Sequence, residues 1–190
     1  MKRIIGIAIA VSAVVVGFII GFVIFRAKSP TTSPTPPPIV TDAESIGPEL
    51  PLQEVALFFY DANALELTRH EVELRLAQNT DKRLEEIVKA LIETAPDELI
   101  NSIPKGTSLY AAYLDEQSTA YLDFSRDLAD GHLVGTTSEF LTVSAILQTV
   151  QVNFPDQISQ VQILIEGQEV DTLGGHIDIS KPLSLMMLAE

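Results

Sequence analysis

Residues 135–155 read GTTSEFLTVSAILQTVQVNFP, and this stretch predicts a helix that begins at Thr136. Thr136-Thr-Ser-Glu139 has the spacing of a capping box, and Glu139 would lie in the positive first turn. Its many β-branched residues leave a strand as the alternative, but about 18 residues is too long for an ordinary strand. Pro155 follows its end. An apolar stripe runs through Phe140, Val143, Leu147, Val150 and Phe154.

A second helix is predicted upstream, beginning at Thr80-Asp81 and ended by Pro96. Glu85 and Lys89 are spaced for an i,i+4 ion pair on its exposed face. Its core-facing residues recur at i, i+3, i+4, i+7 and i+8, which is the period of an amphipathic helix. They are Leu84, Ile87, Val88, Leu91 and Ile92.

Short β-rich runs lie before and after this helix. Glu54 to Tyr60 predicts a buried strand, and the alternation of Leu65 to Leu76 changes phase along its length. A bulge near Arg69-His70 would let both halves face one core. Thr107 to Leu114 and Thr119 to Phe124 are separated by four polar residues, which predicts a hairpin.

The last part of the folded region alternates again from Gln160 to Glu166, with Val161, Ile163 and Ile165 on one face. Gly167 is predicted to turn the chain. Gly174-Gly175 predicts a tight backbone path, through a positive φ or a close approach to the sheet.

These residues together resemble the GerMN domain, named for bacterial sporulation and spore-germination proteins. The resemblance covers roughly Glu54 to Leu183 and implies an α/β domain, an α+β two-layer sandwich with two helices on one face of a mixed or antiparallel sheet. Such a domain is similar to ring-building modules that associate edge to edge in complexes of the bacterial envelope. The matching runs are Gly135–Glu139, Thr149, Phe154-Pro155, Val161–Gly167, Leu173–Ser180 and Pro182.

From this resemblance we expect nine family-motif residues with structural or interface roles. Family members are often lipoproteins or carry two copies of the domain, whereas this chain has no cysteine and one copy. That departure puts a specific sporulation role in doubt. The nine residues are Glu139, Phe154, Pro155, Gly167, Gly174, Gly175, His176, Asp178 and Pro182.

The amino-terminal region predicts a membrane anchor. Ile4 to Phe25 is 22 residues long and contains no charge, amide or proline. As a helix it would measure about 33 Å, against a bilayer core of about 30 Å. A cleaved signal peptide, with an apolar region of about 7–15 residues, and a soluble chain are the alternatives. Gly17 and Gly21 form a GxxxG, a candidate contact between two membrane helices.

Two basic residues flank each end of this segment, so the positive-inside rule does not settle its orientation. The free amino terminus and the short stub favour a cytoplasmic amino end, a single pass through the inner membrane and a carboxyl-terminal domain outside the cytoplasm. Residues 26–52 hold seven prolines and read as an extended tether of at most about 80 Å. We therefore divide the chain into a stub (1–3), a transmembrane helix (4–25), the tether (26–52), the domain (53–183) and a tail (184–190).

The apolar run Leu183 to Leu188 within and just before this tail is predicted to pack on the domain or to cap a partner.

Charge and composition exclude several classes of function. Residues 53–190 carry 23 Asp and Glu against 8 Lys and Arg, a net charge of −15. Such a surface repels phosphate backbones, which argues against nucleic-acid binding. The absence of cysteine excludes disulfides, thiolate metal sites and cysteine nucleophiles.

The titratable residues form no recognisable catalytic constellation. His176 and Asp178, with Asp171 nearby, could offer ligands to a hard cation, as could the acidic run at 123, 127 and 130. The simpler expectation is that His176 and Asp178 hold the glycine turn by side-chain-to-backbone hydrogen bonds. We therefore expect no catalytic, metal-binding or cofactor-binding residue and no cofactor.

The sequence as a whole predicts a non-enzymatic, membrane-tethered scaffold of the cell envelope, acting in sporulation- or envelope-related assemblies. Its expected partners are the lipid bilayer, through Ile4–Phe25, and an envelope protein or a second copy of itself. The alternative is an extracytoplasmic ligand-binding module for cell-wall glycan or a small molecule. An aromatic content of 6% without tryptophan disfavours the glycan version.

Overall fold

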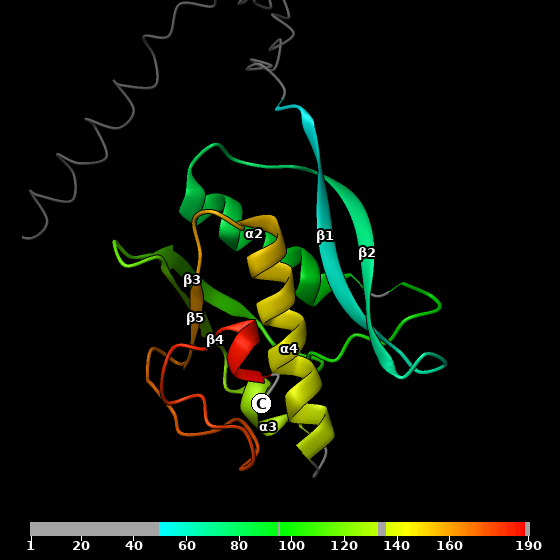
Figure 1. Cartoon of the computed structure of the whole chain (residues 1–190), viewed down its shortest axis with the longest axis vertical. Coiled ribbons are helices and arrows are strands. Elements are labelled where there is room, and N and C mark those ends of the chain that lie inside the picture. Colours follow the sequence, from blue (N-terminus) through cyan, green and yellow to red (C-terminus); the bar gives the residue numbers. More distant parts are fainter. Residues whose placement is uncertain (1–49, 95, 133–135, 189–190) are drawn as a thin grey trace, which may run out of the picture. The chain divides into compact units, whose positions relative to one another are not determined.

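The structure is a computed structural model that describes residues 50–94, 96–132 and 136–188 (Figure 1). These residues belong to one compact unit, Pro48–Glu190. The predicted span Ile4–Phe25, its Gly17 and Gly21, and the tether up to residue 49 lie outside the described residues. Within the described ranges, none of the helices combines the length and the apolar character needed to cross a bilayer.

The domain begins with an antiparallel hairpin of β1 (Leu52–Asp61) and β2 (Glu66–Arg75). Its turn is held by Asp61, whose Oδ1 accepts hydrogen bonds from the N–H of Asn63 at 2.7 Å and of Ala64 at 3.2 Å. The buried strand predicted at residues 54–60 is confirmed.

The bulge predicted in β2 is wrong, because β1 and β2 pair without a break from Leu52↔Arg75 to Asp61↔Glu66. The change of phase arises at the turn instead. Leu65 has a φ of 59° and is 74% exposed, so it belongs to the turn and not to the strand.

A second sheet contains β3 (Leu109–Leu114), β4 (Thr119–Phe124) and β5 (Gln160–Ile165). β3 and β4 form the predicted hairpin, and β5 runs parallel to β4. The expectation of a single sheet is therefore wrong. The domain is α+β with two separate sheets, and the first of them is a two-stranded ribbon.

The two predicted helices are confirmed as α2 (Thr80–Glu93) and α4 (Thr136–Asn153). The side chain of Asn79 caps α2 by accepting from the N–H of Lys82 at 3.0 Å. The Glu85–Lys89 pair forms at 2.6 Å. Short helical turns complete the chain, α3 at Asp127–Asp130 and the 3-10 turn η1 at Leu185–Leu188.

Helix α4 differs from its prediction at its amino end. Thr136 begins the helix, and the carboxylate of Glu139 bonds to a distant loop and not back to the helix start, so the capping box is wrong. Phe140 is 37% exposed, whereas the rest of the predicted stripe is buried. More residues of α4 are buried than a single apolar stripe would account for, because other elements cover the helix on several sides.

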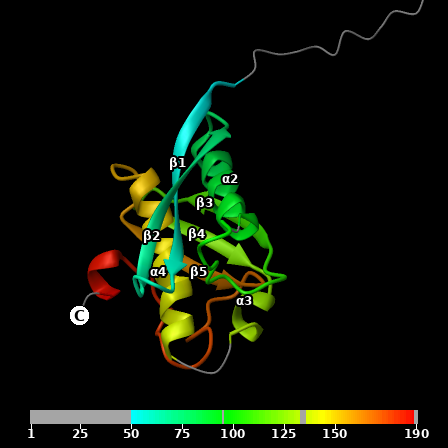
Figure 2. The same ribbon diagram turned by 90° about the vertical axis from the view of Figure 1, so that its right-hand side faces the viewer.

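The core lies where the two helices meet the sheets. α4 packs against β1 and α2, and α2 packs against β3. Figures 1 and 2 both place the β1–β2 ribbon beside the helices. The largest fully buried side chains include Phe59, Leu84, Leu91, Leu122, Phe124, Ile146, Leu147 and Phe154.

Helix α4 also covers the edge of β1 that faces away from β2. Asn153 accepts from the N–H of Ala56 at 3.1 Å and donates to its carbonyl at 2.7 Å. The hydroxyl of Thr149 accepts from the N–H of Phe58 at 3.2 Å. Ile100 then pairs with Tyr60 through two backbone hydrogen bonds. Side chains and one loop residue thus occupy the place of a neighbouring strand.

Candidate functional site

The first turn of α4 carries a buried carboxylate that organises the carboxyl-terminal loop. Glu139 has no exposed surface. Its Oε1 accepts from the N–H of Leu173 and of Ile177, both at 3.1 Å. Its Oε2 accepts from the N–H of His176 at 3.1 Å and contacts the Nδ1 of the same ring at 3.2 Å. One side chain therefore fixes the loop over 173–177.

The surroundings of Glu139 favour its ionised form. Burial raises the pKa of its carboxyl, but the N–H groups of Ile177, Gly174 and His176 and the His176 ring together outweigh burial and leave the pKa below its ordinary value. Burial also lowers the pKa of nearby His132, and the charge of Glu139 opposes that change. The site therefore holds a carboxylate with its hydrogen bonds satisfied.

Both glycines of the loop are required by this arrangement. A Cβ on Gly174 would lie 3.2 Å from Oε2 of Glu139, so Gly174 permits the close approach. Gly175 has a φ of +99°, which side chains rarely adopt. The predicted tight path is confirmed, although the close approach is to a helix carboxylate and not to the sheet.

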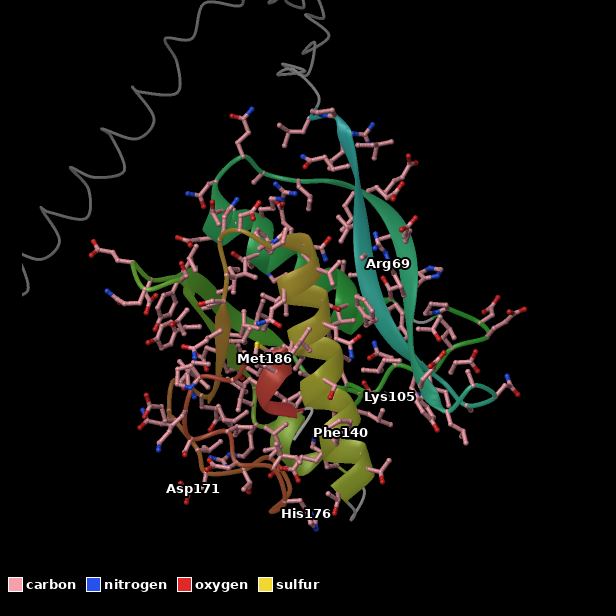
Figure 3. The ribbon with its side chains drawn as sticks, in the orientation of Figure 1. Arg69, Lys105, Phe140, Asp171, His176 and Met186 are labelled. Atoms are coloured by element: carbon pink, nitrogen blue, oxygen red, sulfur yellow. The ribbon has the colours of Figure 1, made fainter. Side chains whose placement is uncertain are left out.

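Asp178 makes the expected kind of side-chain-to-backbone hydrogen bond, but to Ser180 and not within the glycine turn. Asp178 accepts from the N–H of Ser180 at 3.0 Å and from its hydroxyl at 2.6 Å, which lowers the pKa of Asp178. His176 bonds through its ring to Glu139 and not to the backbone. Figure 3 shows His176 and Asp171 at the lower end of the domain, on the carboxyl-terminal loop.

The other predicted motif residues lie elsewhere in the fold. Phe154 is buried at the end of α4 under the guanidinium of Arg83, 5.5 Å from the ring centre, and the exposed Pro155 follows. Gly167 turns the chain after β5 with a φ of +74°. Pro182 precedes Leu183, which pairs with β5. These positions serve turns and packing, and they do not converge on one site.

The histidine and carboxylate side chains determine whether the described part of the chain could hold a metal ion or a catalytic triad. Among the described residues, no cluster of three or more histidine, aspartate or glutamate side chains could hold a metal ion. Nδ1 of His132 lies 3.2 Å from the hydroxyl of Ser138. The carboxylate of Glu139 is committed to the 173–177 loop, so it does not orient this histidine in the manner of a catalytic triad.

Three hollows of about 630, 390 and 640 Å³ adjoin one another along α4. The first and second share Leu141, and the second and third share Leu185. We call this surface the α4 groove. Its apolar lining comprises Tyr60, Leu65, Leu67, Ile100, Ile103, Pro104, Phe140, Leu141, Pro155, Ile158, Leu185 and Met186.

Several of these apolar side chains are exposed to solvent, including Ile100, Phe140 and Met186. Figure 3 shows Phe140 and Met186 beside α4, with Lys105 on the neighbouring loop. The prediction that the apolar tail packs on the domain is confirmed, because the N–H of Leu185 donates to Oε1 of Gln151 on α4 at 3.2 Å. The sequence did not predict the groove, since its walls come from four separate segments.

The floor of the middle hollow contains an unusual polar group. Ser144 is 3% exposed, and its hydroxyl has no hydrogen-bond partner among the described residues. A buried hydroxyl without a partner is unfavourable. The α4 groove is lined mainly by apolar side chains.

Comparisons with solved structures identify the same fold. A Clostridium perfringens protein described as a lipoprotein is 24% identical with a TM-score of 0.52, and the match covers 71% of this chain and 89% of that one. The first GerMN domain of the sporulation protein GerM from Bacillus subtilis is 22% identical with a TM-score of 0.55, covering 70% and 98%. The tandem GerMN domains of GerM are 20% identical with a TM-score of 0.55, and the match covers 70% of this chain and 46% of that one. At these identities the likeness is one of fold.

No curated protein matches the chain. The family Germane, described as "Sporulation and spore germination", matches residues 56–171. This range contains every described helix and strand except η1 and the first residues of β1. It ends before the glycine loop, so the Leu173–Pro182 run of the resemblance lies beyond it. Since the match spans more than half of the sequence, the chain belongs to the Germane family.

Proposed function

We propose that this protein is a non-enzymatic scaffold of the bacterial cell envelope. Its folded domain receives a protein partner in the α4 groove outside the cytoplasm, while Ile4–Phe25 spans the inner membrane. The role falls within sporulation- or envelope-related assemblies.

The α4 groove is the observation that carries this proposal. A monomeric domain exposes few contiguous apolar surfaces, and those that it does expose are often interaction sites. Here the exposed apolar side chains Leu65, Phe140 and Met186 come from the β1–β2 turn, α4 and η1. Leu65 and Phe140 line one hollow, and Met186 lines the adjoining one.

The family and the similar structures support the cellular setting. The family description names sporulation and spore germination, and similar structures include a lipoprotein and a sporulation protein. Membrane tethering rests on the apolar length of Ile4–Phe25 and on its basic flanks. The acidic domain would remain soluble beside an anionic membrane surface.

Site-specific photo-crosslinking in cells tests the proposal. A photoreactive phenylalanine analogue in place of Phe140 should crosslink the full-length protein to a discrete partner. The same analogue in place of Tyr110, which is exposed on β3 and outside the groove, is the matched control. Equal labelling from both positions, or none from Phe140, would contradict the proposal.

A glycan-binding function is the second candidate, because the second sheet presents exposed aromatic rings. Tyr113 and Tyr121 are cross-strand partners whose rings stack at 4.8 Å with an angle of 3° between their planes. Tyr113 is 42% exposed and Tyr110 is 59% exposed. Aromatic faces of this kind can bind sugar rings, although overall aromatic content is low.

Retention on purified cell-wall material separates the two candidates. A glycan-binding module would be retained, and replacing Tyr113 by alanine would abolish retention. A protein scaffold would not be retained, and the Tyr113 variant would leave its crosslinks from position 140 unchanged.

A further inference from the structure

The outer edge of β2 has the open backbone groups of a strand that awaits a neighbour. In β1, Ala56, Phe58 and Tyr60 direct their backbone groups away from β2, toward α4 and Ile100. Their cross-strand partners are Glu71, Arg69 and Leu67. In an antiparallel ladder such pairs do not bond to each other, so these three residues of β2 direct their N–H and C=O groups outward.

No described residue accepts or donates a hydrogen bond at the backbone of Leu67, Arg69 or Glu71 on that side. Figure 1 shows β2 at the outside of the ribbon, with β1 nearer to α4. The two edges of the ribbon therefore differ in whether their backbone groups have hydrogen-bond partners. The edge of β1 is covered by Asn153, Thr149 and Ile100, whereas the edge of β2 is open.

The shape of β2 suits pairing with another strand. It runs for 10 residues with an unbroken register and contains no proline. Proteins commonly protect free edges with bulges, prolines or very short strands, and β2 has none of these. Charge is the only protective device that remains, so the arrangement of charges decides which strand can approach.

The exposed charges of β2 are complementary to those of a second β2. Arg69 and Glu71 form an ion pair at 2.9 Å, with side chains 52% and 48% exposed. In two-fold antiparallel pairing, outward-directed residues lie opposite outward-directed residues. When Arg69 of each strand lies opposite Glu71 of the other, two Arg69–Glu71 ion pairs form, one on each side of the two-fold axis.

The adjacent registers are disfavoured by like charges. Moving the strands by one step in one direction places Glu71 opposite Glu71, although Arg69 then lies opposite Glu73. Moving them in the other direction places Arg69 opposite Arg69. Like charges directly opposite each other destabilise a sheet. The net charge of the domain also opposes association, but beyond about 8 Å this repulsion is largely screened at physiological ionic strength.

We propose that β2 pairs antiparallel with β2 of a second copy of this chain, with Arg69 of each copy opposite Glu71 of the other. The two ribbons then form one four-stranded sheet. The contact is isologous, so it closes at two copies. It goes beyond the proposed function, since it uses the free backbone edge of β2 and not the face of α4 that carries Phe140, although Leu67 of that edge also lines the α4 groove.

Cysteine crosslinking of the full-length protein tests this register, because the chain has no natural cysteine. Directly opposed residues in such a pair have Cα atoms about 5.5 Å apart, which a disulfide can bridge. Two differently tagged copies, one with Arg69→Cys and one with Glu71→Cys, should form a mixed disulfide in oxidised membranes. Arg69→Cys alone should not, because its two cysteines are diagonal neighbours whose Cα atoms lie about 7–8 Å apart, too far for a disulfide.

Charge reversal provides the second test. With Leu67→Cys and Glu73→Cys on the two copies as the reporter pair, Arg69→Glu or Glu71→Arg should lower the disulfide yield at least fivefold. The double variant Arg69→Glu/Glu71→Arg should restore the disulfide yield, because the ion pair within each strand and the two pairs between the copies form again. A thermal midpoint measured on each variant shows whether folding has changed.

A mixed 69–71 disulfide at dimer mass, together with rescue by the double variant, supports the proposal. No mixed disulfide, crosslinks that ignore charge reversal, or a self-disulfide at position 71 would overturn it. Crosslinking from position 140 reports on the α4 groove separately, so failure of either idea is distinguishable from failure of the other.

Discussion

Asn153 at the end of α4 hydrogen-bonds both the N–H and the carbonyl of Ala56 in β1, at 3.1 and 2.7 Å, across 97 residues of sequence. A side-chain amide has the same donor and acceptor as a peptide group, so Asn153 replaces one residue of a missing strand. The same amide donates to the carbonyl of Thr149 within α4 at 2.7 Å, which orients it. The ribbon and the helix are therefore joined by polar contacts as well as by the apolar core.

Replacing Asn153 by alanine should destabilise the domain by about 2 kcal/mol, because it leaves a part-buried donor and acceptor of Ala56 without partners. Asn153→Asp keeps the acceptor but turns a carboxylate oxygen toward the carbonyls of Ala56 and Thr149, so it should destabilise the domain at least as much as alanine does. Denaturant unfolding gives the free energies. Asp156→Ala, at a nearby exposed position, is the control. An Asn153→Ala variant as stable as this control would refute the role.

Replacing Glu139 by glutamine should destabilise the protein by about 3 kcal/mol, since the amide accepts at one atom only and turns a donor toward other donors. Hydrogen exchange at Leu173, His176 and Ile177 should accelerate, because these N–H groups lose their acceptor. Glu116→Gln, on the exposed β3–β4 turn, controls for loss of charge. Unchanged protection in the loop would show that Glu139 does not hold it.

Acid should remove the contribution of Glu139. Burial raises the pKa of this carboxyl, but its donors lower it further, so the folded pKa lies below the ordinary value of 4.5. As the pH falls, the unfolded state therefore takes up this proton first. The stabilisation is complete above the unfolded pKa and is lost as the pH falls through the folded pKa.

The measurement is the free energy of unfolding of the natural protein minus that of Glu139→Gln, from about pH 7 to about pH 3. This difference should be constant near neutral pH and should shrink in acid. A difference that stays constant throughout, or that grows as the pH falls, would mean that the folded pKa is not lowered.

Local patterns predicted the elements whose signals lie within one segment. The stripe of α2 is confirmed at Leu84, Ile87, Val88 and Leu91, because one face of this helix meets the core and the other meets water. The stripe of α4 was less informative. Its buried residues include Thr142, Ser144 and Thr149, which a purely apolar period does not identify.

Contacts between distant segments could not be predicted in the same way. Glu139 was placed correctly in the first turn of α4, yet its partners lie 34–38 residues further along the chain. Nothing in a local pattern distinguishes a carboxylate that caps its own helix from one that binds a loop. The exposure of Phe140 has the same origin, since it depends on where β2 and η1 leave the helix uncovered.

The two loop glycines should respond differently to alanine. Gly175→Ala should cost about 1 kcal/mol through its positive φ whatever its neighbours, because no atom lies within 4 Å of the added methyl group. Gly174→Ala should be destabilising through contact with Glu139, whose carboxylate is fixed by several hydrogen bonds. In a Glu139→Ala background the effect of Gly174→Ala should fall and that of Gly175→Ala should not. Equal changes for both glycines would reject this distinction.

The α4 groove makes a final prediction about partner capture. Phe140→Glu places a charge in the groove, and since the side chain is 37% exposed the domain should remain folded, with a thermal midpoint close to that of the natural protein. With the photoreactive analogue in place of Met186, crosslinking to the partner should fall about tenfold. Burying an unpaired carboxylate against an apolar partner is unfavourable. Val152→Glu is the matched control, since Val152 is 38% exposed on the same helix but lines none of the three hollows. If both variants reduce capture equally, the effect is one of charge on α4, and the groove is not the binding site.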